Sequence, residues 1–188
     1  MCVIEMTTVQ PLTNEEKREH QYNGESGHAA AYVSTFAKYN AGSLAGQWVD
    51  LETFGDADEL CDYLCRLHAD ECDPEFMFQD FDNLPEKFRA ECMCPDELSE
   101  MYAYFDLEDD VREIVGEYWD EIDSSAFVEN ILDRHICSGD ANDYFDELAD
   151  EMLNECPENL RYYFNYKAWE RDCAFDYDVT SNHVFCKY

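Results

Sequence analysis

The stretch DLEDDVREIVGEYWDEIDSS, residues 106–125, decides the fold expected for the middle of this chain. Its apolar residues recur at helical spacing, which predicts a helix with one face packed against a core. The opposite face carries Asp109, Glu113, Glu117 and Glu121, each four residues after the one before. Like charges at this spacing destabilise an isolated helix by about 0.2–0.5 kcal/mol per pair. The stretch therefore predicts an amphipathic helix whose acidic face serves a purpose other than helix stability.

The same excess of acids extends over a large central part of the chain. The 188 residues include 45 Asp and Glu against 12 Lys and Arg, a formal net charge of −33. Residues 50–158 contain 36 of these acids and only 5 of the bases. The acids alternate with apolar residues, and 15% of the chain is aromatic, whereas disordered acidic tails are poor in aromatic residues. We therefore expect the carboxylates to lie on the surface of folded elements.

The sequence shows no recognisable targeting or membrane-spanning segment. Its first twenty residues lack the basic start and apolar run of a signal peptide. No uncharged apolar run approaches the ~18 residues of a membrane span. We therefore expect a cytoplasmic protein without membrane association, whose ten cysteines are reduced.

The first half of the chain is expected to begin with an extension and to continue as a β-rich domain. Residues 1–28 are polar and show no periodicity, so they predict a flexible N-terminal extension. Two strand-like runs, residues 31–39 and 47–51, flank a connection marked by Gly and Asn, which predicts a β-hairpin. The other elements expected here are a helix over residues 57–68, opened by a capping box of Asp56 and Glu59, and a strand over residues 76–81.

The second half is predicted to be helical at first and then mixed. Apolar stripes predict only helices over residues 95–135. Further stripes predict an acidic helix around residues 144–152 and another helix over residues 160–169. The last run, FDYDVTSNHVFCKY, predicts a hairpin that turns at residues 181–182.

The many acids do not form a recognisable metal-binding motif. Acids after Asp106 and after Asp140 imitate a calcium-binding EF-hand loop, but an apolar residue stands where that loop requires Gly. Structural zinc sites usually take their ligands in pairs from separate turns. The one candidate zinc set has instead the spacing of a single helix face: Cys61, Cys65, His68 and Cys72. We therefore expect no metal or other cofactor.

Catalytic motifs are also missing from the sequence. Pro95-Asp96 could begin a nuclease motif, which also requires, later in the chain, an acid followed two residues on by Lys. No Lys after Asp96 stands at that distance from an acid. The five His stand apart from any Ser or Cys nucleophile signature, and there is no Gly-rich phosphate-binding loop. We expect a protein that is not an enzyme.

The negative charge opposes binding to nucleic acid and favours binding to proteins that themselves bind nucleic acid. Proteins bind DNA by neutralising phosphates with Lys and Arg, and the central 109 residues hold only five. Duplex DNA carries one charge per ~1.7 Å of axis, so the net charge of the central part corresponds to roughly 50 Å of duplex. Carboxylates three or four residues apart on a helix lie ~5–6 Å apart, a spacing comparable to that of successive phosphates. These features favour a protein that mimics a polyanion, with a halophilic surface as the main alternative.

Four blocks of sequence resemble one known family in their order and spacing. They are YVSTFAKYNAGSLAGQWVDL (residues 32–51), DPEFMFQDFDNLP (73–85), NLRYYFNYKAWERD (159–172) and TSNHVF (180–185). Together they resemble the ArdA antirestriction proteins over about residues 30–188. The acidic middle resembles the family in pattern more than in identity.

This resemblance implies a function and a domain organisation. Members of the family are cytoplasmic proteins of mobile bacterial elements that mimic bent B-form DNA and occupy the DNA-binding groove of type I restriction-modification enzymes. They have no enzymatic activity and no cofactor, and they form homodimers through the C-terminal domain. The implied fold is α+β, an elongated chain of three small domains. Carried onto this chain, these are an α+β domain with an antiparallel sheet at 29–93, a helical domain at 94–135 and an α+β dimerisation domain at 136–188.

The acids expected to imitate phosphates lie on or directly beside the predicted strand and two of the predicted helices. They are Asp80, Asp82, Asp109, Asp110, Glu113, Glu117, Asp120, Glu121, Asp143, Glu147, Asp150 and Glu151. The expected partner is a type I restriction-modification enzyme. The alternatives are a mimic directed at another DNA-binding protein, an acidic chaperone or cation-binding protein, and a carboxylate enzyme.

Overall fold

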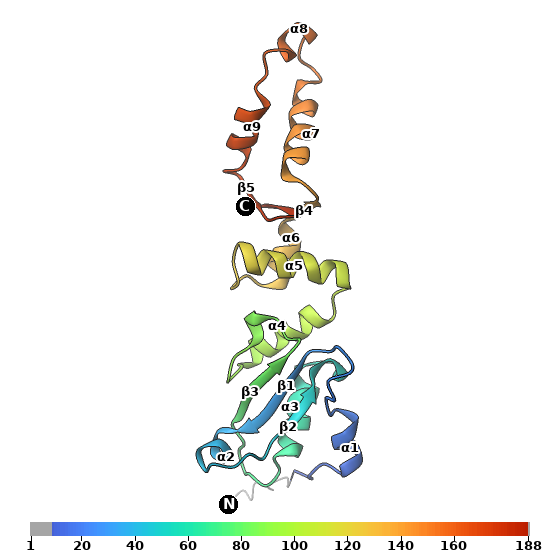
Figure 1. Cartoon of the computed structure of the whole chain (residues 1–188), viewed down its shortest axis with the longest axis vertical. Helices are drawn as coiled ribbons and strands as arrows, with labels where there is room; N and C mark the ends of the chain where they lie inside the picture. The colour runs from blue at the N-terminus through green and yellow to red at the C-terminus, as the bar shows by residue number, and fades with distance from the viewer. Residues whose placement is uncertain (1–8, 188) are drawn as a thin grey trace, which may run out of the picture. The chain divides into compact units, whose positions relative to one another are not determined.

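The computed structural model describes residues 9–187 and divides the chain into two compact units, Met1–Asp106 and Leu107–Tyr188. The fold is mixed α+β: the described residues form nine α-helices and two three-stranded antiparallel sheets, one sheet in each unit (Figure 1). None of the helices within the described residues has the length and apolar character needed to cross a membrane.

The first sheet confirms the predicted hairpin and the third strand. It consists of β1 (Ala30–Thr35), β2 (Gln47–Asp50) and β3 (Phe76–Asp82), in the order β2-β1-β3. β1 pairs antiparallel with both neighbours and is buried along most of its length. A bulge between Tyr32 and Val33 shifts its register against β3. β3 is therefore an edge strand of this sheet.

The first predicted strand is shorter than the sequence indicated. β1 ends at Thr35, whose hydroxyl accepts a hydrogen bond from the backbone nitrogen of Lys38 at 3.2 Å and caps the short helix α2 (Phe36–Asn40). A threonine at the N-cap satisfies a backbone donor that the helix itself leaves open. This local cap outweighs the strand propensity of the aromatic residues that follow.

Helix α3 (Ala57–Leu67) confirms the predicted helix and its N-cap. The Asp56 carboxylate accepts from the backbone nitrogen of Glu59 at 2.9 Å, while Glu59 accepts from the backbone nitrogen of Gly55 at 2.8 Å instead of from Asp56. The helix buries Leu60 and Leu64 completely. Two 3₁₀ turns, η1 (Leu51–Thr53) and η2 (Glu86–Phe88), connect elements of the same unit.

The expectation of a flexible extension is wrong for the part of residues 1–28 that is described. Helix α1 (Asn14–Glu19) begins with a complete capping box between Thr13 and Glu16. The chain then forms a β-bridge between Gln21 and Val49, and the side chains of Leu12 and Tyr22 are buried. The polar helix shows little periodicity because it contributes no buried residue itself. The first eight residues of the expected extension lie outside the described part.

The predicted helical domain at 94–135 is divided between the two units. Helix α4 (Pro95–Phe105) belongs to the first unit, where Leu98 and Met101 are buried and the Tyr102 hydroxyl donates to the carbonyl of Leu51 at 3.0 Å. Helices α5 (Asp109–Glu121) and α6 (Val128–Arg134) belong to the second unit. The helices of this region were therefore predicted correctly. The prediction did not show that the buried face of α4 packs within the first unit.

The second sheet contains the predicted closing hairpin and one unpredicted strand. The hairpin consists of β5 (Tyr177–Val179) and β6 (His183–Cys186). The additional strand, β4 (His135–Ser138), pairs with β6 to give the order β4-β6-β5. β4 has only four residues and directly follows α6, so its apolar pattern could not be separated from that of the helix.

Three helices complete the second unit. The acidic helix α7 (Ala141–Leu153) confirms the prediction, and it lies beside α9 (Tyr166–Cys173) (Figure 1). The single helix expected over residues 160–169 is instead broken into α8 (Glu158–Arg161) and α9. The break follows from the Asn165 side chain, which accepts from the backbone nitrogen of Ala168 at 3.2 Å and starts a new helix.

Candidate partner-binding surface

Helix α5 is held on the second unit by its apolar face. Val115, Tyr118 and Trp119 are buried, and the Tyr118 ring packs edge-on against Phe185 of β6 with a centroid distance of 4.7 Å. Arg134 of α6 donates to the Tyr118 hydroxyl at 2.7 Å and also pairs with Asp178 of β5. The predicted core face of this helix is thereby confirmed for these three residues, whereas Ile122 at its end is exposed.

The row of acids on α5 does not form one solvent-facing line. Asp109 and Glu113 are exposed, but Glu117 accepts hydrogen bonds from the backbone nitrogen and Nδ2 of Asn182 at 2.6 and 3.0 Å. Glu121 accepts from the backbone nitrogen and hydroxyl of Ser181 at 2.9 and 2.7 Å. Half of the row is therefore engaged by the turn of the closing hairpin.

Helix geometry explains why the row divides. At 3.6 residues per turn, a step of four residues advances about 40° beyond a full turn. From Asp109 to Glu121 the row therefore winds by about 120° around the helix axis. Its first half faces solvent and its second half faces the β5–β6 turn.

Glu117 stands in a partly buried polar network. Only 13% of its side chain is exposed, and His183 Nε2 lies 3.8 Å from its carboxylate. Burial by itself raises the pKa of the Glu117 carboxyl, but the nearby Thr180 hydroxyl and the hydrogen bonds from Asn182 outweigh burial and hold that pKa below its ordinary value of 4.5. This carboxylate is stabilised as an anion by its own chain.

The acids at the start of α5 also have a local role. Asp109 and Asp110 occupy the first turn of the helix, where the unsatisfied backbone N–H groups favour negative charge. The Asp110 carboxylate accepts from the backbone nitrogen of Val111 at 3.0 Å. Part of the repulsion expected along this helix is therefore offset at its N-terminus.

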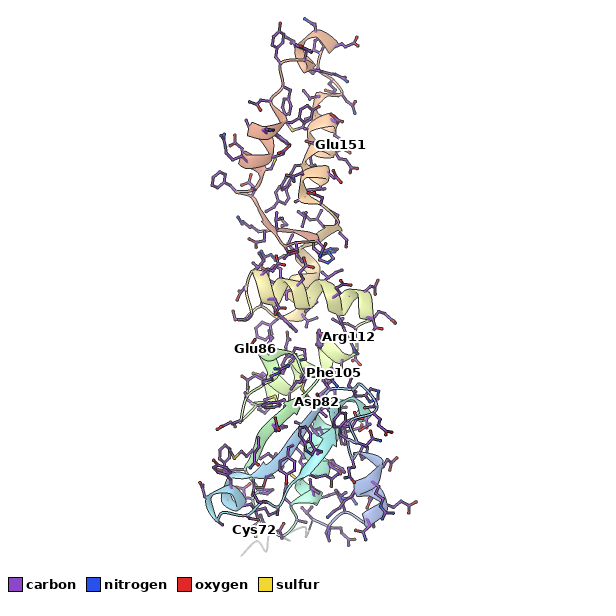
Figure 2. The ribbon with its side chains drawn as sticks, in the orientation of Figure 1. Cys72, Asp82, Glu86, Phe105, Arg112 and Glu151 are labelled. Carbon is purple, nitrogen blue, oxygen red and sulfur yellow. The ribbon has the colours of Figure 1, made fainter. Side chains whose placement is uncertain are left out.

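Helix α7 provides a second acidic surface. Its buried side is formed by Phe145 and Ala149, and the candidate acids on its other sides are all exposed. Asp150 accepts from the Tyr166 hydroxyl of α9 at 2.6 Å. The carboxylates of the other candidates on α7 make no hydrogen bond or ion pair with any of residues 9–187: Asp143, Glu147 and Glu151. Figure 2 labels Glu151 on this helix.

The two acids of β3 lie on the exposed edge strand of the first sheet. Asp80 and Asp82 pair in register with Tyr32 and Ala30 of β1. Asp82 accepts from the Tyr22 hydroxyl at 2.6 Å, which raises the pKa of that phenol. Charges on an edge strand also prevent pairing with other sheets, so these two acids have a sufficient structural explanation.

Eleven of the twelve candidate acids are exposed, and Glu117 is the exception. The carboxylates of six of them make no hydrogen bond or ion pair among residues 9–187, and all six lie on α5 and α7. They are Asp109, Glu113, Asp120, Asp143, Glu147 and Glu151. A carboxylate only accepts hydrogen bonds, so this surface is suited to a partner rich in Lys and Arg donors.

Ser181 and Asn182 were predicted as turn residues, but not as hydrogen-bond donors to Glu121 and Glu117. A Ser-Asn pair at a hairpin turn has backbone and side-chain donors, and this was the only sign in the sequence that the turn could bind carboxylates. The sequence could not show that the tip returns to α5, since the two segments are 60 or more residues apart.

The candidate zinc set lies along α3 and the turn after it. His68 is buried, and its Nδ1 accepts from the Lys38 ammonium at 2.9 Å. Burial and the Lys38 charge lower the pKa of His68 from 6.5 to about 4. Within residues 9–187, no three His, Cys, Asp or Glu side chains are grouped so as to hold a metal ion.

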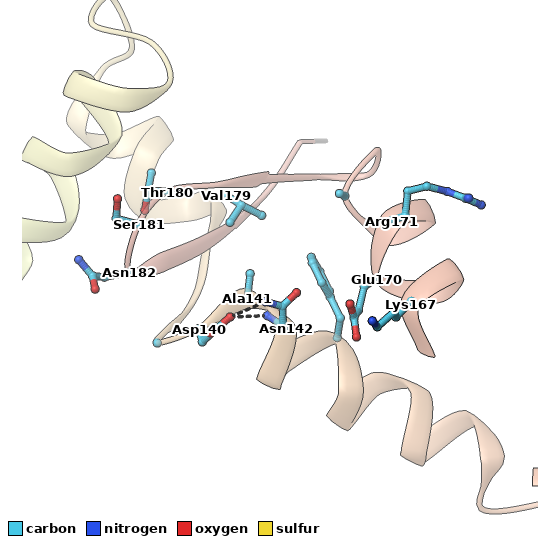
Figure 3. A pocket seen from close by; sticks show the side chains of 13 residues that line it. Asp140, Ala141, Asn142, Lys167, Glu170, Arg171, Val179, Thr180, Ser181 and Asn182 are labelled. Carbon is cyan, nitrogen blue, oxygen red and sulfur yellow. Dashed lines mark hydrogen bonds between the residues drawn. The ribbon is translucent and has the colours of Figure 1, made fainter. Parts of the chain in front are cut away.

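One cavity of the second unit combines charges of both signs. It has a volume of about 720 Å³ and is lined by the start of α7, by α9 and by the β5–β6 turn (Figure 3). Lys167 and Glu170 of α9 lie opposite Asp140, whose carboxylate accepts from the backbone nitrogen and Nδ2 of Asn142 at 2.8 and 3.0 Å. Its mixed charge differs from the uniform charge of the acidic surfaces.

Comparison with known proteins supports the family suggested by the sequence blocks. No curated protein matches the chain. A sequence model described as antirestriction protein (ArdA) matches residues 31–185, which include both acidic helices and both sheets except the first residue of β1 and the last of β6. Because this match extends over most of its length, the chain belongs to the ArdA family of antirestriction proteins.

Proposed function

We propose that this protein inhibits type I restriction-modification enzymes by occupying their DNA-binding groove as a polyanion. The observation that carries the proposal is the set of six exposed carboxylates on α5 and α7 that no group among residues 9–187 neutralises. The family consists of antirestriction inhibitors rather than enzymes, which supports a restriction enzyme as the target.

The physical basis is the release of counterions. A protein groove lined with Lys and Arg binds DNA largely because it displaces cations condensed on the phosphates. A rigid protein surface with closely spaced carboxylates also attracts cations, and these are released in the same way when a Lys- and Arg-rich groove binds it. It requires no base recognition, so it competes with DNA of any sequence.

The test is direct competition between this protein and DNA for a purified type I enzyme. We expect the wild-type protein to displace a labelled duplex from the enzyme and to block DNA cleavage. A variant in which all six acids are replaced by Asn or Gln serves as the control, and it should bind at least tenfold more weakly if the charges act through counterion release. Equal inhibition by the two proteins would show that these acids do not form the binding surface.

Infection provides a second test inside cells. We expect unmodified phage to plate with higher efficiency on a type I restricting host that expresses the protein, with no change on a non-restricting host. Unchanged plating on the restricting host, together with capture of a different DNA-binding protein, would indicate another target of the same mimicry.

The proposal includes a homodimer, three functional domains and a cytoplasmic location, as the family resemblance implies. Large apolar side chains are exposed at the end of α7 and around α8, where a dimer contact would bury them. They are Met152, Leu160, Tyr162 and Tyr163. Analytical ultracentrifugation of the wild type and of a Tyr162→Ser/Tyr163→Ser variant tests this contact, since the variant should sediment as a monomer.

A further inference from the structure

The C-terminal half of α5 is fastened to the turn of the closing hairpin by four hydrogen bonds. Glu117 and Glu121 each use both carboxylate oxygens, and each binds one backbone N–H and one side-chain donor of the turn. The two carboxylates lie one helical turn apart. We call this arrangement, formed by Glu117, Glu121, Ser181 and Asn182, the α5 clamp.

The clamp supplies a directional restraint that the apolar contacts of α5 lack. Burial of Val115 and Trp119 is favourable but non-directional, so a small rotation of the helix about its axis could preserve much of it. Bidentate hydrogen bonds to a carboxylate depend on distance and angle. Two of them on successive turns fix both the rotation of α5 and its position along the hairpin.

The carboxylates of the clamp are poorly placed to contact a partner. Glu117 is largely buried, and its oxygens already accept hydrogen bonds from Asn182 with His183 nearby. Glu121 is exposed, but both of its oxygens accept hydrogen bonds from Ser181, so a Lys or Arg of a partner would have to share them with these donors. By contrast, Asp109, Glu113 and Asp120 on the same helix are exposed and have no such bonds within residues 9–187.

We propose that Glu117 and Glu121 are positioning residues, which lock α5 to the hairpin so that its exposed acids are held as a fixed array for the partner. This inference rests on the proposed function. A surface that is already ordered binds more tightly because less conformational freedom is lost on association. Glu117 and Glu121 therefore contribute to binding indirectly, by holding the exposed acids of α5 in position.

Two double variants with the same change in charge test this assignment. Glu117→Gln/Glu121→Gln removes two charges but keeps the clamp, because a glutamine carbonyl still accepts the backbone N–H and its amide can donate to the Ser181 hydroxyl or to the Asn182 carbonyl oxygen. Asp109→Asn/Glu113→Gln removes two charges from exposed positions. We expect the dissociation constant for a type I enzyme to rise on the order of tenfold in the second variant and less than about threefold in the first.

A third variant breaks the clamp. Glu117→Ala/Glu121→Ala removes all four hydrogen bonds, and we expect it to weaken binding at least as much as Asp109→Asn/Glu113→Gln does. Hydrogen exchange of the Ser181 and Asn182 amides should be faster in this variant than in the wild type and in the glutamine variant. Circular dichroism of each variant establishes that the unit is folded.

The outcomes separate the inference from the proposed function. Loss of binding in the glutamine variant equal to that of Asp109→Asn/Glu113→Gln would overturn the inference, since it would make the clamp acids partner contacts. Wild-type binding by the alanine variant would overturn it as well. If the wild type binds no type I enzyme, the proposed function fails, and unchanged exchange of the Ser181 and Asn182 amides in the alanine variant would then separately refute the clamp.

Discussion

Salt should weaken binding of this protein to its target by a large factor that the structure allows us to estimate. The perturbation is an increase in salt at constant pH and temperature. Each ionic contact that releases a counterion from a DNA-like surface contributes a slope of about −0.9 to the dependence of log K on log salt. Six acids of α5 and α7 are exposed and have no partner within residues 9–187.

If each of these six acids meets one cation of the partner, the total slope is about −5. Raising the salt from about 50 mM to about 200 mM then lowers the association constant roughly 10³-fold. Glu117 and Glu121 are left out of this count, because their oxygens already accept hydrogen bonds from the hairpin turn and we do not expect them to contact a cation of the partner.

The assay is fluorescence anisotropy of the labelled protein titrated with a type I enzyme in the absence of DNA. DNA must be left out because its own binding depends on salt in the same direction. A variant with all six acids changed to Asn or Gln provides the control and should show a slope close to zero. A slope shallower than about −1 for the wild type would refute the reasoning, because contacts of a polyanion cannot be so insensitive to salt.

Three further predictions concern stability. Because the pKa of His68 falls from 6.5 to about 4 in the fold, the unfolded chain binds the proton first on acidification, so stability is complete above pH 6.5 and declines towards pH 4. Urea unfolding should therefore show about 2 kcal/mol less stability for the wild type at pH 5 than at pH 7.5, relative to the same change in His68→Gln. Thr13→Ala removes the capping box of α1 and should lower the free energy of unfolding by about 1 kcal/mol in the same measurement. No change would mean that this segment is a flexible extension. Leu60→Ala, at a fully buried position of α3, should cost about 2–5 kcal/mol, whereas Leu44→Ala at an exposed loop position should stay within about 0.5 kcal/mol, and equal losses would mean that the burial of α3 is misassigned.

Local sequence signals predicted the elements that are stabilised within themselves or by adjacent segments. The hairpin of β1 and β2 and that of β5 and β6 follow from strand-like runs joined by turn residues. Helix α3 follows from the cap at Asp56, and α5 and α7 follow from apolar stripes of helical period. In each of these elements the signal that predicts its type lies within about 20 residues, so the order of residues contains it.

Elements that depend on distant contacts were missed or misplaced. The four residues of β4 become a strand because β6, almost 50 residues later, offers a partner. The segment around α1 is polar, yet it is held by the bridge from Gln21 to Val49 and by the burial of Tyr22. Neither contact leaves a periodic pattern in the segment itself.

The sequence by itself determined the charge, the α+β composition and the family, because these depend on which residues are present and in what order. It also identified the acids that line α5 and α7. Only the tertiary structure decided which of those acids remain available, because a row of residues four apart winds around a helix and meets whatever lies beside it. On α5 the neighbour is the Ser181–Asn182 turn, so Glu117 and Glu121 are bound within the chain while Asp109 and Glu113 remain exposed.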